Sequence, residues 1–181
     1  MRRRLFIAID IPIGTKKKVQ KIMEPLIIKY PEKRWEDYHK YHLTVKFLGS
    51  TSINPQKIIA NVKEKLKSFP AFEIKFGDIS IISNKKNNVL VIEPDANEEL
   101  LKLFYMLNNS LCELGFKREK RKFYPHISLA RLNQTEMNIP ENINKSLGKL
   151  SKITVSEISL FSSQLTKDGS IYNKEGSVGL I

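Results

Sequence analysis

A short pattern occurs twice in this chain of 181 residues and limits the folds that it can adopt. His42-Leu43-Thr44-Val45 recurs as His126-Ile127-Ser128-Leu129, and both segments read histidine, aliphatic, hydroxyl, aliphatic. Such alternation predicts a half-buried β-strand, in which residues i and i+2 face the same side. Each strand then presents one imidazole and one hydroxyl to one face. In the first strand we expect Leu43, Val45 and Phe47 to face the core together.

Helical and strand periodicities alternate along the rest of the chain. The predicted helices cover residues 14–30, 54–68, 97–114 and 140–148. The predicted strands cover residues 5–11, 42–48, 72–83, 88–93, 126–132, 153–161 and 170–180, with a short piece around Trp35 at residues 34–35 and a turn at Asn84–Asn87. Pro25 is expected to end or kink the first helix, and Gly115 to stop the third. Because helices and strands intermix and hairpins occur, we expect an α+β fold with mainly antiparallel sheets and helices on the outer faces.

The charge of the chain favours an anionic partner. Lys and Arg number 31 against 19 Asp and Glu, which gives a formal net charge of +12. A positive field of this size attracts RNA, DNA or phosphorylated metabolites. An AT-rich genome also enriches Lys, Ile and Asn, so the charge alone does not select a nucleic acid.

The cysteine and histidine counts limit metal chemistry. A single cysteine, Cys112, excludes an internal disulfide and a multi-thiolate zinc site, and three histidines leave little room for a His-rich metal site. The apolar run Leu5–Ile9 ends at Asp10 and is shorter than the roughly 7–15 residues of a secretory signal core. No run approaches the ~18 apolar residues of a membrane span, so we expect a cytoplasmic protein with no membrane partner.

The repeated segments suit chemistry at a phosphodiester. If the two strands lie side by side about a pseudo-twofold axis, two imidazoles and two hydroxyls meet at one small site. Displacement at phosphorus needs a base for the entering nucleophile and an acid for the departing oxygen, and imidazole can serve as either near neutral pH. Hydroxyl groups can stabilise the charge that develops on the non-bridging oxygens. A single histidine at the start of a strand is more often a packing or hydrogen-bonding residue, so the pair carries this hypothesis.

The longer segments around both histidines resemble the two-histidine phosphoesterases, and specifically their RNA 2′,3′-cyclic phosphodiesterase branch, historically called 2′-5′ RNA ligase. These segments are Tyr41–Gly49 and Phe123–Arg131. Arg4–Asp10 and Ile158–Ser163, followed by Gly169 and Tyr172, are also similar, so the resemblance spans nearly the whole chain. It implies a bilobal α+β fold with two sheets related by a pseudo-twofold axis around a central cleft. Residues 1–181 would form a single domain of two packed lobes, each contributing one segment (42–45 and 126–129).

The resemblance also implies a reaction, which is hydrolysis of an RNA 2′,3′-cyclic phosphate terminus to a 2′-phosphate. In this scheme His42 is the general acid that protonates the departing 3′-oxygen, and His126 is the general base that activates water, with Thr44 and Ser128 beside them. The sequence does not fix which histidine has which role. The reverse use of the same groups would give 2′-5′ RNA ligation. We expect no cofactor, no metal and a monomer, with an RNA end or a nucleotide as partner.

Arg131 matches a family arginine that contacts the phosphate. Strand alternation places it on the face opposite His126, so it needs a bend in the strand to reach the cleft, and the alternative is a surface arginine. Ser128 replaces the commoner threonine and keeps the hydroxyl. The strand Asn88–Ile92 lacks an aromatic residue that many relatives carry, which leaves open how the nucleobase is held.

Two other functions remain open at this stage. One is a phosphodiesterase acting on small cyclic or 2′-5′ nucleotides, and the other is a non-catalytic RNA-binding protein with the same cleft. The remaining candidate residues have simpler interpretations: a solvated loop for His39, core positions for Trp35 and Cys112, with stacking on a base as the alternative for Trp35, solvated faces that also attract the RNA backbone for Arg2–Arg4 and Lys16–Lys18, and either an RNA approach or an exposed loop for Lys117–Lys122.

Overall fold

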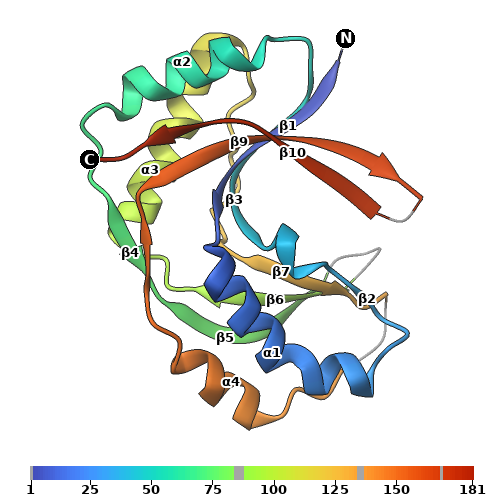
Figure 1. The fold of residues 1–181 in the computed structure, drawn as a ribbon. Helices are drawn as coiled ribbons and strands as arrows, with labels where there is room; N and C mark the ends of the chain where they lie inside the picture. Colours follow the sequence, from blue (N-terminus) through green and yellow to red (C-terminus); the bar gives the residue numbers. More distant parts are fainter. Residues whose placement is uncertain (1, 84–87, 134–136, 168) are drawn as a thin grey trace.

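The computed structural model of the chain describes residues 2–83, 88–133, 137–167 and 169–181 (Figure 1). Its helices are α1 Ile13–Lys29, α2 Pro55–Leu66, α3 Glu98–Ser110 and α4 Glu141–Gly148, with short 3₁₀ helices at Tyr38–Lys40 and Leu111–Leu114. Its strands are β1 Arg3–Asp10, β2 Arg34–Trp35, β3 His42–Thr51, β4 Phe72–Ile74, β5 Phe76–Ser83, β6 Asn88–Pro94, β7 Ile127–Arg131, β8 Ile153–Val155, β9 Glu157–Thr166 and β10 Gly169–Gly179. The predicted turn at residues 84–87 lies outside the described residues.

The main sheet has eight antiparallel strands in the order β10-β9-β1-β3-β7-β6-β5, with β2 paired to β7. A second, smaller sheet pairs β4 with β8. The α+β class and the antiparallel pairing are therefore confirmed. The main sheet has two halves, β10-β9-β1-β3 and β7-β6-β5, and their assignment as the two lobes of one domain stays a prediction. These halves are joined where Leu43 of β3 pairs with Ile127 of β7.

The helices lie outside the two halves of the main sheet (Figure 1). Helices α2 and α3 accompany the half that contains β9 and β10, whereas α1 and α4 accompany the half that contains β5 and β6. The predicted strands at 72–83 and 153–161 are each divided in two, because Lys75 and Ser156 interrupt them. Their first parts, β4 and β8, pair with each other beside the main sheet.

Local signals explain where the helices begin and end. Asn54 and Asn97 cap α2 and α3, because each side-chain oxygen accepts a hydrogen bond from a backbone N–H in the first turn. Gly115 has a φ of +85°, which permits the left-handed turn that follows α3 and its 3₁₀ extension. Pro25 neither ends nor divides α1, which continues to Lys29.

An extra residue in β3 changes which side chains face the core. The register runs from Ala8↔Thr44 to Ile7↔Lys46, so Val45 is a β-bulge without a partner in β1. Alternation is inverted beyond the bulge: Lys46 points into the core and is 4% exposed, whereas Phe47 is 66% exposed. The predicted core position of Phe47 is therefore wrong, while Leu43 and Val45 are buried as expected.

Two lysine side chains are buried, Lys46 contrary to strand alternation and Lys16 contrary to the sequence prediction. Lys46 donates hydrogen bonds to the Asn108 side chain (2.7 Å) and to the Lys117 carbonyl (3.0 Å), which compensate for its desolvation. Lys16, which we placed on a solvated face, is 5% exposed and forms an ion pair with Asp10 at 2.7 Å.

Within the described ranges, no helix combines the length and the apolar character that spanning a membrane requires.

Candidate active site

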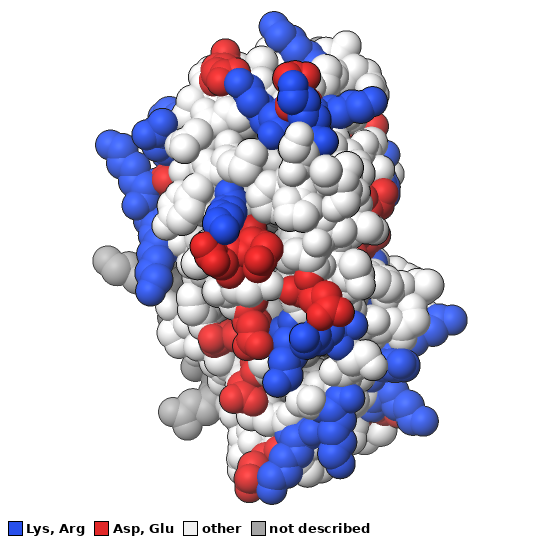
Figure 2. Space-filling view, turned by 90° about the vertical axis from the view of Figure 1, so that its left-hand side faces the viewer, with Lys and Arg blue, Asp and Glu red and all other residues white. Residues whose placement is uncertain are grey.

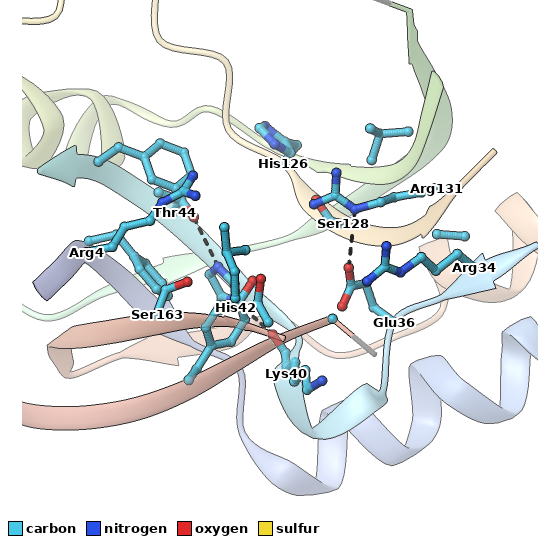
Figure 3. A pocket seen from close by; sticks show the side chains of 18 of the residues that line it. Arg4, Arg34, Glu36, Lys40, His42, Thr44, His126, Ser128, Arg131 and Ser163 are labelled. Atoms are coloured by element: carbon cyan, nitrogen blue, oxygen red, sulfur yellow. Dashed lines mark hydrogen bonds and ion pairs between the residues drawn. The ribbon is translucent and has the colours of Figure 1, made fainter. Parts of the chain in front are cut away.

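The junction between the two halves of the sheet brings the repeated segments together. Leu43 pairs with Ile127 in an antiparallel register. Continued by one residue in each direction, this register sets His42 across from Ser128 and Thr44 across from His126. These four side chains line one cavity of about 620 Å³ (Figure 3). The two segments therefore lie side by side at this junction, while the pseudo-twofold axis stays a prediction.

Both imidazoles are oriented by the same local hydrogen bond. His42 Nδ1 lies 2.6 Å from the Lys40 carbonyl oxygen, and His126 Nδ1 lies 2.9 Å from the Tyr124 carbonyl oxygen. In each case the acceptor is two residues before the histidine. Because a carbonyl oxygen can only accept, each Nδ1 carries a proton and each Nε2 is left for exchange with a substrate. His42 Nε2 lies 3.1 Å from Thr44 Oγ1, whose hydroxyl can donate to it when the ring is neutral.

The two histidines have different surroundings. The His42 ring packs against Phe6 at 5.0 Å and against the edge of Tyr172 at 5.3 Å between centroids. This burial lowers the pKa of His42 below its ordinary value of 6.5, against smaller opposing effects of the Lys40 carbonyl and the Asp10 charge. Among the described residues, the one aromatic ring near His126 is that of Tyr124, at 6.2 Å between centroids. The site therefore combines one enclosed imidazole with a more open one.

The cavity is strongly cationic. Arg4, Arg34, Lys40 and Arg131 line it, together with one carboxylate, Glu36, among the described residues (Figure 3). Elsewhere the two signs are more evenly mixed: on the face seen in Figure 2, basic and acidic groups are interspersed. Lys65 of α2 and Lys102 of α3 form ion pairs with Glu113 and Glu98. The cavity is therefore suited to an anionic ligand.

A second bulge turns Arg131 toward the cavity. The register with β6 runs from Val91↔Ser128 to Leu90↔Ala130, so Leu129 is the extra residue. Beyond it, Arg131 pairs with Val89, and both side chains line the cavity. The bulges at Val45 and Leu129 each lie three residues after a histidine. The bend that Arg131 needs to reach the cavity is thus present, and the bulge in β3 likewise places Phe47 in the cavity lining.

Sequence reasoning missed Arg34, Glu36 and Lys40, and it placed Arg4 on a solvated face. Lys40 had a possible signal, because it stands two residues before His42 and its carbonyl oxygen holds that ring. The other three reach the cavity only through strand pairing, which the local pattern does not reveal.

Family comparison agrees with this site. A family model described as the 2′-5′ RNA ligase superfamily matches residues 28–166. The chain belongs to this superfamily. Among its relatives, the RNA 2′,3′-cyclic phosphodiesterase of Methanocaldococcus jannaschii is 32% identical, with coverage of 93% of this chain and 96% of the relative. The RNA 2′,3′-cyclic phosphodiesterase of Bacillus subtilis is 29% identical, with coverage of 92% and 91%.

The superfamily fold is also found among solved structures. Apo E. coli LigT superposes with a TM-score of 0.76 at 24% identity and covers 99% of this chain and 98% of its own. This likeness supports the fold, and the resemblance that the two histidine segments suggested is confirmed by the family match.

Trp35, His39 and Cys112 lie outside the lining of this cavity. Trp35 is half-buried against the core, and its Nε1 donates to the Tyr30 carbonyl at 3.0 Å. His39 packs on the Tyr38 ring at 4.0 Å in the 3₁₀ turn before β3. Cys112 is half-buried, and its thiol donates to the Asn108 carbonyl at 3.2 Å. These contacts are structural and give none of the three a role in the chemistry.

Proposed function

We propose that this protein hydrolyses RNA 2′,3′-cyclic phosphate ends to 2′-phosphates. The observation that carries the proposal is the Leu43–Ile127 pairing, which directs two histidines and two hydroxyls into one cationic cavity. The names of the Bacillus subtilis and Methanocaldococcus jannaschii relatives support the choice of substrate.

The geometry suggests how the reaction is divided between the two imidazoles. His126 Nε2 takes a proton from a water molecule, whose oxygen forms a bond to phosphorus. The bond between phosphorus and the 3′-oxygen breaks, and His42 Nε2 gives its proton to that oxygen. The product carries a 2′-phosphate and a 3′-hydroxyl. His126 then releases its proton to solvent and His42 takes one up, which restores both rings.

The hydroxyls and cations act on the phosphoryl oxygens. Once His42 is protonated, the Thr44 hydroxyl no longer has an acceptor on that ring and can donate to a non-bridging oxygen. Ser128 holds the equivalent position beside His126. Arg131 and the other cations of the cavity oppose the negative charge that grows as water attacks.

The lowered pKa of His42 bears on the acid role. In the free site, burial favours the neutral ring at neutral pH. A bound cyclic phosphate brings a negative charge close to the ring and raises the pKa of His42 again. We therefore propose that His42 is charged chiefly in the substrate complex, which is where an acid is required.

We further propose that the reaction needs no metal, because the two imidazoles account for both proton transfers and the cationic lining accounts for charge stabilisation. The same groups can join RNA if the 5′-hydroxyl of a second strand replaces water, which gives a 2′-5′ linkage. We propose that the protein acts as a cytoplasmic monomer, with both segments supplied by one chain.

The proposal is tested with a short RNA ending in a 2′,3′-cyclic phosphate, incubated with the protein in the presence of EDTA. Phosphorus NMR of the product identifies the oxygen that retains the phosphate. We expect a 2′-phosphate at the rate measured without EDTA. Binding without turnover would contradict the proposal and favour a non-catalytic RNA-binding protein, and a 3′-phosphate product would contradict the assigned leaving group.

A further inference from the structure

Two arginines face each other across neighbouring strands of the cavity. In the β2–β7 pairing, Arg34 lies directly opposite Arg131. Side chains of directly paired residues leave the sheet on the same face, and both arginines line the cavity (Figure 3). Like charges placed directly opposite each other destabilise a sheet unless something neutralises them. This pair therefore indicates a place for negative charge.

The carboxylate nearby compensates only part of this charge. Glu36 Oε1 lies 3.9 Å from Arg131 Nε. Arg34 has no ion pair with any residue in the described part of the chain. Figure 3 shows Arg34 and Arg131 on either side of Glu36, all three reaching into the cavity. Counting only the residues that the structure describes, one carboxylate faces two guanidinium groups, which leaves one positive charge available to a ligand.

The Arg34 side chain is positioned by the other half of the sheet. A Cβ added at Gly169 would come within 3.2 Å of Arg34 Nη2, so the guanidinium lies against the backbone at the start of β10. Arg34 thus extends from β2 toward the end of the β9–β10 hairpin. It is held at one end of the cavity by packing rather than by a described carboxylate.

Arg34 lies beside the end of β7 that is farther from His126. His126 precedes β7, whereas Arg34 pairs with Arg131, the last residue of that strand. At ~3.3 Å per residue, these ends of the segment lie on the order of 15 Å apart along the backbone. Arg131 can extend back toward the histidines, but Arg34 is one strand further out. Arg34 is therefore placed for a second anionic group of a ligand whose reacting phosphate lies at the histidines.

We propose that Arg34 binds the phosphate on the 5′-oxygen of the terminal nucleotide, one ribose away from the cyclic phosphate that reacts. This inference rests on the proposed function and specifies its substrate. The planar guanidinium can donate two parallel hydrogen bonds to phosphate oxygens. In an RNA strand, the 5′-linkage of the terminal nucleotide is the nearest second anion to the cyclic phosphate. The site then prefers RNA ends over nucleoside 2′,3′-cyclic phosphates, which lack that group.

Three substrates with the same terminal base test this subsite. They are a nucleoside 2′,3′-cyclic phosphate, its 5′-phosphorylated form, and a dinucleotide whose only additional phosphate is the internucleotide linkage. The measured quantity is the kcat/KM of each phosphorylated substrate divided by that of the first. We expect the native protein to prefer both by about tenfold or more, as one charge-assisted interaction supplies.

Variants at Arg34 identify the group responsible. Arg34→Gln should reduce both ratios to within about twofold of one, and Arg34→Lys should retain part of them because it keeps the charge without the planar fork. Lys102→Gln is the control, since Lys102 is exposed on α3, pairs with Glu98 and does not line the cavity; it should keep the native ratios.

The outcomes separate this inference from the proposed function. Equal kcat/KM values for all three substrates in the native protein, or native ratios in Arg34→Gln, would overturn the subsite while hydrolysis itself remained. A preference confined to the free 5′-monophosphate would overturn its assignment to an RNA linkage. Failure to hydrolyse any of the three would instead contradict the proposed function.

Discussion

Leu43 lies opposite Ile127 at the point where the two halves of the main sheet meet. Each residue directly follows a histidine, so this one pairing determines how the two imidazoles approach each other. Both aliphatic side chains are buried, at 0% and 1% exposure. Because these two side chains pack together, the stability of the junction and the geometry of the site depend on the same contact.

Removal of either imidazole should abolish most of the activity. We expect His42→Ala and His126→Ala each to lower kcat by about 10²–10⁴-fold, because each variant lacks one of the two proton transfers. His39→Ala is the matched control: this histidine lies outside the main cavity lining and should retain native kcat. Thermal unfolding of all three variants checks that they fold. Substantial activity in either of the first two variants would contradict a two-histidine mechanism.

The hydroxyl groups should contribute to the rate rather than to the fold. We expect Thr44→Val and Ser128→Ala each to lower kcat by about 10²-fold, since a lost donor to a developing oxyanion costs about this much. Thr44→Ser keeps the hydroxyl and should retain most of the activity. If Thr44→Val and Thr44→Ser had equal kcat values, packing rather than hydrogen bonding would be the role of this side chain.

The enclosure of His42 should be visible in its titration. Burial lowers the pKa of this ring from 6.5, so NMR titration of the free protein should give a midpoint below that value. Tyr172→Ala opens one side of the ring and should raise the midpoint. If His42 is the acid, activity requires its protonated form, so the limb of kcat/KM that falls with rising pH should move to higher pH in this variant. Movement of the opposite limb would assign His42 as the base.

The bulge at Val45 predicts losses of stability of different size at two positions of β3. Phe47→Ala should lower the free energy of unfolding by less than about 1 kcal/mol, as expected of an exposed residue. Leu43→Ala should lower it by about 2–5 kcal/mol, because it leaves a cavity in the core. Urea denaturation measures both values. A cost for Phe47→Ala as large as that for Leu43→Ala would place Phe47 in the core and contradict the bulge.

The elements that carry the chemistry could be predicted from the sequence because their signals are local. His42 and Thr44 share a face through the two-residue period of a strand, as do His126 and Ser128. The helices could be predicted from their apolar periodicity, and Gly115 indicated where the third one ends. The burial of Leu43 and Ile127 follows from the same alternation. Their direct pairing was suggested only by the similarity between the two segments.

The remainder depends on tertiary structure. Strand alternation assumes that every residue has a partner, so it does not predict an unpaired residue at a bulge. The bulges at Val45 and Leu129 therefore reversed the predicted faces of Phe47 and Arg131. Lys16 appeared to be a surface lysine because Asp10, its partner, belongs to another element. Arg34 reaches the cavity because two residues of β2 pair with β7, and two residues are too few to show a period.

A structure of the protein bound to an RNA product with a terminal 2′-phosphate tests the central claim most directly. The account predicts that His42 Nε2 and His126 Nε2 both lie within about 3 Å of oxygen atoms on, or bridging to, one phosphorus atom. A phosphate held by only one of the two rings, or bound outside the cavity that they share, would contradict it.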